Sequence, residues 1–463
     1  VATSLSSRKF RLSSSSPPEE MRLIVPILLS VLTCSFARES LRGELWDQSR
    51  RLKGNKERKG AKGKNEKMKR GKEKKKKDKG AQPIIYDTDY GPFIDDVFGL
   101  GLIVNSGDVL DLKYVIATSE DPPLSAKCVA KHLALSDRPD IPVGIGAEFP
   151  PFAERGGVCG IPGLVGFALE DECQDVTLPV DENGLEAMAT MIMESGRDDW
   201  WYIVVGGLST VKALMEQYPE AAAKIDTLVS MGGNWCADFE PYPDVMAPTD
   251  ETNIACDPAA ANAILDNSPF SNIYFVPVVV ADEIGGEDYI KIVEAANSGA
   301  DPGAKATLDF YRAWSAAGRA DPNLLIHLEA LTYDPETEST PQFDPCAIMI
   351  AMELLMDCPE KRVALVDVPA VHFLEPGEGV PFPGAPRSAF SLFPEGFTVD
   401  PLPDQCPALT PYRFNPAETP EDEKEVTIAL GYTSARAKAS FYADMAARMA
   451  GETVGCPNLS SYT

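Results

Sequence analysis

Histidine and closely spaced cysteine pairs are what this sequence most clearly lacks. Its 463 residues include three His and ten Cys, and no two Cys form a CxxC pair. Structural zinc sites are built mainly from His and Cys ligands at short spacings. We therefore expect no zinc site.

Basic residues are scarce beyond residue 80. Residues 1–80 contain 23 Lys and Arg against 9 Asp and Glu, whereas the remainder contains 20 against 61. An acidic body of this kind repels nucleic-acid phosphates and the headgroups of anionic membranes. We therefore expect no nucleic acid and no membrane surface as a partner.

The apolar run near the N-terminus is shorter than the roughly 20 residues that span a bilayer. This run, residues 23–32, follows Met21-Arg22 and precedes the small residues Ser35 and Ala37. That pattern is typical of a cleaved signal peptide. We expect no membrane span in the mature chain.

The first 80 residues therefore divide into a targeting segment and a linker. We expect a leader and signal peptide at 1–37, with the signal itself at 21–37, and a basic disordered linker at 38–80. Residues 50–79 hold 17 Lys and Arg and almost nothing apolar, which is typical of disorder. The prediction is a secreted or endomembrane protein. Residues 34–37 also resemble the bipartite plastid signals of some algae, so plastid routing stays open.

Nine scattered Cys lie beyond the signal peptide. In a secreted chain such residues are usually disulfide-bonded, although the pairing cannot be read from the sequence. An odd number leaves at least one thiol over.

From residue 81 the sequence alternates between strand-like and helix-like segments. The runs 201–205 and 273–280 are continuously apolar, as strands of a parallel sheet buried on both faces are. The pattern predicts an α/β fold: a single Rossmann-like domain at 81–456, with a mostly parallel central sheet flanked by helices. Residues 374–424 are rich in Pro and Gly, which predicts a long irregular insertion near the C-terminus. Residues 457–463 would form a tail.

Four carboxylates crowd the end of the first expected strand. Asp87, Asp89, Asp95 and Asp96 follow the apolar run 83–86. Ionised carboxylates held this close repel one another unless a counter-charge lies between them. Oxygen ligands favour Ca²⁺ or Mg²⁺, and in open parallel sheets ligands bind at the carboxyl ends of the strands. The alternative is an acidic loop that caps the next helix, although one cap needs one Asp.

Three later segments are candidates for the same edge of the sheet. The first, 205–210, has two Gly that free backbone carbonyls, or is an ordinary strand-to-helix turn. The second holds Glu251 and Asn253, which on an extended stretch would face the same side and suit neighbouring hydroxyls. The third contains Asp344-Pro345, where Asp344 is a helix cap or a ligand.

Taken together, these segments resemble the inosine-uridine preferring nucleoside hydrolase family, over about residues 83–368 and again at 425–449. The family's DxDxGxDD opening is similar to Asp87–Asp96, here with two extra residues before the Asp pair. The family's Gly-Gly turn, Met-Gly-Gly strand end, Glu-x-Asn segment and late Asp-Pro-x-Ala are similar, in the same order, to residues 206–210, 231–233, 251–258 and 344–347.

The resemblance implies a ribonucleoside hydrolase with Ca²⁺ at the bottom of a ribose pocket. The implied metal ligands are Asp89, Asp96, Asp344 and the backbone carbonyl of Val205. The implied ribose-binding residues are Asp95, Glu251, Asn253 and, at the place of a family Asn, Asp121. Asp87 would support the loop.

The chemistry of such a reaction suits these residues. Hydrolysis of an N-glycosidic bond passes through an oxocarbenium-like sugar, so the pocket must stabilise positive charge and deliver a water. Asp89 would accept the proton of that water, and Asp95 and Glu251 would supply negative charge near the cation.

Two departures from the family leave the activation of the leaving base unassigned. Phe343 and Cys159 stand where the family often has His. His327 and Tyr333 are candidate acids, although nothing in the spacing selects either. Stacking on an aromatic residue is the alternative. The candidates for stacking, any of which is equally explained as a core or loop residue, are Trp235, Phe239, Tyr242, Trp314 and Phe343.

Two other functions fit parts of the pattern. One is a catalytically degenerate protein that binds nucleosides or ribose, because the family His residues are missing. The other is a haloacid dehalogenase-type phosphatase, because a strand ending in Asp-x-Asp also carries that nucleophile. The sequence does not determine the preferred base or the oligomeric state, and a homo-oligomer remains open.

Overall fold

The computed structural model describes residues 80–91, 93–119, 121–150, 169–233, 252–277, 280–321, 326–369, 425–457 and 459. All of them belong to one compact unit. The predicted signal peptide, nearly all of the basic linker, the insertion at 374–424 and most of the tail lie outside the described residues.

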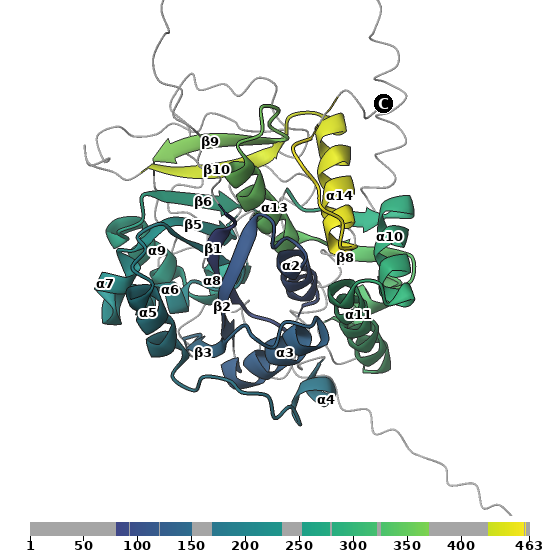
Figure 1. Ribbon diagram of the computed structural model, residues 1–463, viewed down its shortest axis with the longest axis horizontal. Coiled ribbons are helices and arrows are strands. Elements are labelled where there is room, and N and C mark those ends of the chain that lie inside the picture. Colours follow the sequence, from purple (N-terminus) through teal and green to yellow (C-terminus); the bar gives the residue numbers. More distant parts are fainter. Residues whose placement is uncertain are drawn as a thin grey trace, which may run out of the picture. The chain divides into compact units, whose positions relative to one another are not determined.

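Eight strands form the main sheet, in the order β3-β2-β1-β4-β5-β6-β10-β9 (Figure 1). All neighbouring strands are parallel except β9, which runs antiparallel to β10. The strands are β1 (Gln82–Thr88), β2 (Leu110–Ser119), β3 (Val143–Glu148), β4 (Trp200–Val204), β5 (Ile225–Met231), β6 (Asn272–Val276), β9 (Val363–Pro369) and β10 (Glu425–Tyr432).

The strand order confirms the predicted Rossmann-like α/β domain. The chain winds outward from β1 to β3 and then returns to place β4 on the other side of β1. The order therefore reverses between β1 and β4. In doubly wound sheets the crevice at the carboxyl ends of these two strands is the usual ligand site.

Helices cover both faces of the sheet. In Figure 1, α5, α6, α7 and α9 lie on one side and α2, α10, α11 and α14 on the other. The longer helices are α2 (Asp95–Val104), α3 (Pro122–Leu135), α5 (Gly184–Glu194), α6 (Ser209–Gln217), α9 (Pro258–Asn267), α10 (Gly286–Ser298), α11 (Pro302–Ala320), α13 (Phe343–Met356) and α14 (Ala435–Met449). The short ones are α4 (Glu170–Cys173), α7 (Pro219–Ala222), α8 (Thr252–Cys256) and α12 (His327–Thr332).

The alternation of side chains along β1 assigns its residues to two separate cores. Ile84 and Tyr86 pack in the core beneath α2 and α13, whereas Ile85 packs in the core beneath α5 and α6. Because successive side chains of a strand point to opposite faces, Thr88 follows Tyr86 toward α2. Asp87 faces the other way.

Three local expectations differ from the structure. Asn253 lies in helix α8 and not on an extended stretch, so the argument that it shares a side with Glu251 is wrong. The strand expected at 273–280 ends at Val276. A two-stranded sheet of β7 (Glu283–Gly285) and β8 (Glu338–Pro341) was not expected at all. Its partners are only three and four residues long, too short for a pattern of alternation to be read.

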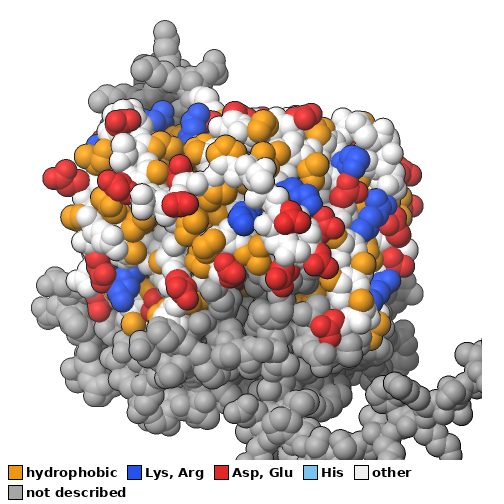
Figure 2. Space-filling model, turned by 90° about the horizontal axis from the view of Figure 1, so that it is seen from below, with side chains coloured by type: hydrophobic (Ala, Val, Ile, Leu, Met, Phe, Trp, Pro, Cys, Tyr) orange, Lys and Arg blue, Asp and Glu red, His pale blue; other side chains and the backbone are white. Residues whose placement is uncertain are grey.

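The described surface carries both charges. Asp and Glu side chains are spread across the face seen in Figure 2, and Lys and Arg side chains lie between them. Within the described part of the chain, no helix has the length and apolar character needed to cross a membrane.

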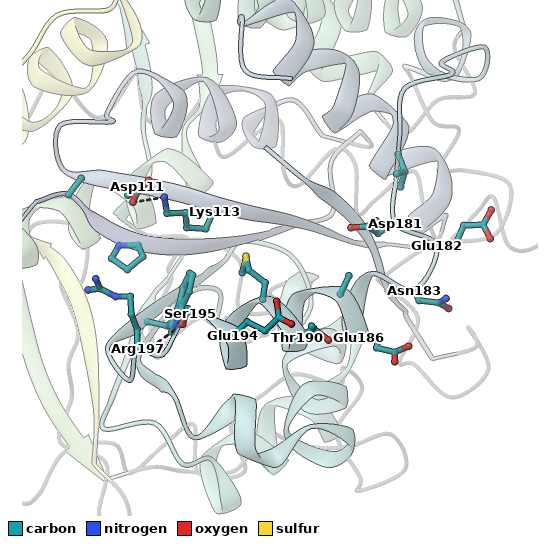
Figure 3. Close-up of a pocket in the computed structure, with 16 residues that line it drawn as sticks. Asp111, Lys113, Asp181, Glu182, Asn183, Glu186, Thr190, Glu194, Ser195 and Arg197 are labelled. Atoms are coloured by element: carbon teal, nitrogen blue, oxygen red, sulfur yellow. Dashed lines mark hydrogen bonds and ion pairs between the residues drawn. The ribbon is translucent and has the colours of Figure 1, made fainter. Parts of the chain in front are cut away.

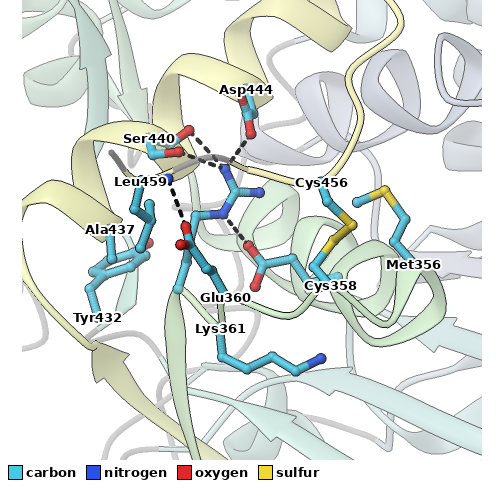
Figure 4. A network of polar contacts seen from close by, with 12 residues as sticks. Met356, Cys358, Glu360, Lys361, Tyr432, Ala437, Ser440, Asp444, Cys456 and Leu459 are labelled. Carbon is cyan, nitrogen blue, oxygen red and sulfur yellow. Dashed lines mark hydrogen bonds and ion pairs between the residues drawn. A yellow bond between two sulfur atoms is a disulfide. The ribbon is translucent and has the colours of Figure 1, made fainter. Parts of the chain in front are cut away.

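A buried arginine joins the last strands to the C-terminal helix (Figure 4). Nε of Arg362 donates to Glu353 on α13 at 2.5 Å, and its Nη1 donates to the Ser440 carbonyl on α14 at 2.9 Å and to the Asp444 carboxylate. The guanidinium also lies 5.4 Å from the centre of the Phe441 ring. One guanidinium therefore contacts two buried carboxylates.

Replacing Arg362 by Met should lower the free energy of unfolding by about 3–5 kcal/mol, because the buried Glu353 would lose the cation that it contacts and Asp444 would lose one of its partners. Urea unfolding measures this loss. The matched control is Arg197→Met, whose partner Asp199 is about half exposed. That change should cost at most about 1 kcal/mol, and equal losses in the two variants would contradict the assignment.

Candidate active site

Three buried carboxylates meet at the switch point of the sheet. Asp95 and Asp96 lie in the first turn of α2, and Asp344 lies in the first turn of α13. One oxygen from each lies within 4.8 Å of the other two. Helix N-termini favour negative charge, and the backbone amides of Asp344, Asp95 and Asp96 all donate toward the Asp95 carboxylate.

Burial and crowding raise the pKa values of two of these carboxylates, Asp95 and Asp96. Burial, followed by the charge of Asp96, raises the pKa of Asp95 well above its usual range. Burial likewise raises the pKa of Asp96, although its hydrogen bonds with Thr88, Asp89 and Asp344 partly offset the effect. These raised pKa values favour the protonated forms of Asp95 and Asp96 near neutral pH when no cation lies between them.

Asp89 joins this cluster to the end of β4. Its half-buried side chain contacts Asp96 through a hydrogen bond. A Cβ added at Gly206 would come within 2.9 Å of the Asp89 carboxylate and 3.0 Å of its Cβ. Only glycine leaves room here for the carboxylate to lie against the loop after β4.

Asp87 lies on the opposite face of β1. Thr118 on β2 donates to it at 2.5 Å, and Tyr202 on β4 donates at 2.7 Å. Burial raises its pKa to about 7 despite these hydrogen bonds. The side chain therefore links the carboxyl ends of three neighbouring strands and does not face the cluster.

Asn253 and Val205 contact each other. The Asn253 amide on α8 donates to the Val205 carbonyl at 2.5 Å, and the Val205 amide donates to the Asp87 carbonyl at 2.9 Å. The predicted backbone ligand and one predicted ribose-binding residue are thus neighbours. Glu251 lies outside the described residues.

Asp121, which the family resemblance implies as a ribose-binding residue, is the N-cap of α3 in the structure. One carboxylate oxygen accepts the Leu124 amide at 3.1 Å and so caps α3. Among the predicted stacking residues, Trp314 is fully buried against Tyr311 in the core. Phe343 packs against the same core as the first residue of α13. Trp235, Phe239, Tyr242 and Cys159 lie outside the described residues.

Three residues near the cluster were missed at the level of sequence. Thr88 donates its hydroxyl to Asp96. Loss of solvent around Glu329 on α12, followed by the charge of Asp95, raises the pKa of Glu329 to about 8. Tyr86 lies beneath the carboxylates with a buried hydroxyl. The DxD opening itself points to Thr88, but no sequence pattern selects Glu329 or distinguishes Tyr86 from an ordinary core residue.

A separate pocket opens near the amino ends of the strands, opposite to the carboxylate cluster (Figure 3). Pro83, Lys113 and Trp200, at the starts of β1, β2 and β4, line it together with residues of α5. It contains no member of the carboxylate cluster. Because ligands of doubly wound sheets bind at the carboxyl ends of the strands, we assign the active site to the cluster and not to this pocket.

The donor set at the switch point fits a hard cation. Every side-chain donor in the cluster is a carboxylate oxygen, and close carboxylates of this kind need either protons or a cation between them. Ca²⁺ and Mg²⁺ both take such ligands. The fold and the site therefore define a Rossmann-like α/β protein with an acidic ligand site of the kind that holds a divalent ion.

Residues 84–430 match the model of the inosine-uridine preferring nucleoside hydrolase family. The match covers most of the chain and includes every carboxylate of the cluster. The chain therefore belongs to this family, as the sequence motifs predict.

Relatives of known identity agree with this membership. The chain is 31% identical over 211 residues to the pyrimidine-specific ribonucleoside hydrolase RihA of Klebsiella pneumoniae subsp. pneumoniae, and 32% identical to that of Salmonella paratyphi A. These matches cover 43% of this chain and 60% of each relative. The chain thus spans about three-fifths of the length of the curated relatives that it matches.

Two solved structures share the fold. A plant nucleoside hydrolase superposes with a TM-score of 0.52 at 19% identity, covering 80% of this chain and 99% of that one. An inosine-guanosine nucleoside hydrolase superposes with a TM-score of 0.54 at 16% identity, covering 81% and 99%.

Without a divalent cation, the protein should lose stability as the pH rises from 6.5 to 8. The folded state holds protons on acids such as Asp87 and Glu329, with pKa values of about 7 and 8, which the unfolded state has already released. The buried His132 has a pKa lowered to about 3. It is neutral in the folded state throughout this range, whereas in the unfolded state it loses about half a proton above pH 6.5. That loss opposes the trend but is smaller than the release of protons from the two acids. Thermal unfolding after chelation measures it.

Adding CaCl₂, as a probe of the cluster, should raise the melting temperature more at pH 8 than at pH 6.5. Asp344→Ala should remove most of this calcium-dependent rise. A melting temperature that increases between pH 6.5 and 8 in the chelated protein, or an equal calcium effect in Asp344→Ala, would contradict the description of the cluster.

Proposed function

We propose that the protein hydrolyses the N-glycosidic bond of ribonucleosides with the help of Ca²⁺, releasing ribose and a free base. One observation carries the proposal. Asp95 and Asp96 are far from Asp344 in the sequence, yet all three meet at the switch point of the sheet. The chain also belongs to a family whose name describes hydrolysis of nucleosides.

The residues of the site divide the work of the reaction. Bound Ca²⁺ would orient ribose hydroxyls and a water and would lower the pKa of that water. Asp96 and Asp344 would hold the ion. Asp89, which is only half-buried and lies beside Asp96, would accept the proton of the water. Asp95 and Asn253 would hold ribose hydroxyls, and the crowded carboxylates favour an oxocarbenium-like transition state.

The leaving base needs a proton or a stacking partner, and neither family His position supplies one. Phe343 cannot donate a proton. Glu329 stays protonated near neutral pH beside Asp95, so it joins His327 and Tyr333 as a candidate acid. The side chain of His327 lies outside the described structure.

The choice of base does not transfer from the relatives. The curated relatives are named as pyrimidine-specific, whereas one structural neighbour is named for inosine and guanosine. We therefore propose the reaction without a preferred base. A panel of ribonucleosides, read by release of reducing sugar with and without chelator, determines it.

Of the two other functions, the family match removes support for a phosphatase of the haloacid dehalogenase type. A degenerate binder remains as the second candidate, because Phe343 stands at a family His position. Binding of inosine in a calorimeter with no release of ribose over hours would favour the binder.

Asp89→Asn should lower kcat by about 10²–10⁴, because the water loses its base. The melting temperature should change little, since the amide fits the same space beside Gly206. The matched control is Asp226→Asn, which removes a carboxylate at the start of β5, the end remote from the site. Wild-type turnover in Asp89→Asn would remove the assignment of the base.

We also propose that the protein is made in an oxidising compartment, by secretion. Two disulfides support this, Cys128–Cys173 and Cys358–Cys456, while the buried Cys346 is free. Disulfides persist mainly in secreted and endomembrane proteins.

A secreting host should export the protein with residues 1–37 removed, because the apolar run at 23–32 should engage the export machinery. Sequencing the N-terminus of the exported protein checks the cleavage. Leu28→Arg, which breaks the apolar run, should keep the protein inside the cell. Export of that variant, or retention of uncleaved wild-type protein, would contradict the proposal.

A further inference from the structure

The hydroxyl of Tyr86 is buried beneath the carboxylate cluster and makes no hydrogen bond of normal geometry among the described residues, although the neighbouring Thr88 hydroxyl lies close enough to offset part of the rise in its pKa. Its side chain is completely buried. Leaving a buried hydroxyl without a well-formed hydrogen bond is unfavourable. A phenylalanine would fill the same core without that cost, so the position of the hydroxyl calls for an explanation.

Glycine at position 99 makes the room that this hydroxyl occupies. A Cβ added at Gly99 on α2 would come within 2.6 Å of the Tyr86 oxygen and within 3.4 Å of the Asp344 Cβ. The hydroxyl and the Asp344 side chain therefore reach the same point between α2 and α13. The Ile348 side chain reaches the same point, with its Cδ1 atom 3.1 Å from the added Cβ, so the tyrosine oxygen lies at the boundary between the apolar core and the base of the cluster.

The surroundings of Tyr86 keep its hydroxyl a neutral donor. Burial, followed by the charges of Asp344 and Asp96, raises the pKa of Tyr86 far above its usual range. Asp344 has the larger effect of these two carboxylates. Thr88, two residues along β1 on the same face, already directs its own hydroxyl at Asp96. The two hydroxyls of β1 are thus placed beneath two different carboxylates.

A bound cation would change what the carboxylates need. Without the ion, Asp96 shares hydrogen bonds with Thr88, Asp89 and Asp344, so the carboxylates are held by one another and by the Thr88 hydroxyl. With the ion, the carboxylates are ionised, and an oxygen that faces away from the ion needs a donor. Donors behind ligating groups fix their orientation and typically raise metal affinity 10- to 100-fold.

We propose that Tyr86 is a positioning residue of the cation site, whose hydroxyl donates to the Asp344 carboxylate when Asp344 binds a divalent ion. The inference rests on the proposed function, because it requires that the cluster binds Ca²⁺.

Calorimetric titration of the chelated full-length protein with CaCl₂ tests the proposal. Tyr86→Phe should weaken calcium binding by roughly 10- to 100-fold. It should leave the melting temperature of the calcium-free protein nearly unchanged, because the lost hydroxyl makes no hydrogen bond of normal geometry there. Saturating calcium should restore kcat. A purely structural tyrosine would show the reverse pattern, with lower stability and unchanged calcium affinity.

Tyr289→Phe is the matched control. Tyr289 on α10 is equally buried, and its hydroxyl donates to the Pro335 carbonyl at 2.9 Å. The charged groups that act on it do not include the cluster carboxylates. This variant should lower the melting temperature and leave calcium affinity unchanged. Gly99→Ala is a second probe. It should weaken calcium binding in the wild-type background and have a smaller effect when Tyr86 is already Phe.

The outcomes separate the two proposals. If wild-type protein takes up no calcium, the cation in the proposed function is wrong, and this inference falls with it. If wild-type protein binds calcium and Tyr86→Phe binds it equally well, only the role of Tyr86 is wrong.

Discussion

Mutual repulsion among buried carboxylates is the constraint on which the rest of the structure depends. Burial raises the pKa of Asp95 and of Asp96, and backbone amides at the start of α2 and the Thr88 hydroxyl partly offset that rise. Two helices must begin at the same place for this to work. The α2 helix begins just after β1, and α13 begins just after β8 of the small two-stranded sheet, so the two starts come from different parts of the fold. The topology thus brings together charges that no local sequence could hold together.

Much of the fold could be predicted because its signals are local. The run 201–205 reads as a buried parallel strand, and the structure forms β4 there. The proximity of Asp344 to Asp96 is different. It depends on packing between helices more than two hundred residues apart, and only resemblance to a family with a known arrangement could predict it.

The features that the sequence did not predict are those that depend on contacts between residues far apart in the chain. The sequence around Asn253 does not distinguish a strand from a helix. In the structure Asn253 lies in α8, and its side chain donates to the Val205 carbonyl just after β4. Glu329 differs from other helical glutamates only through its solvent-poor position near Asp95. Tyr86 looks like any core aromatic until Gly99 is found beside its oxygen. Disulfide pairing, as for Cys358 with Cys456, likewise depends on the folded chain.

The pairing at the edge of the main sheet has a consequence for how such a chain can change in length. Pro369, the last residue of β9, lies opposite Glu425, the first residue of β10. Whatever lies between them leaves and re-enters the domain at adjacent points. The entropy of closing a loop grows only slowly with its length, so this position tolerates gain or loss of whole segments. Evolution could therefore lengthen or trim the region between β9 and β10 while the catalytic edge, several strands away, kept its geometry.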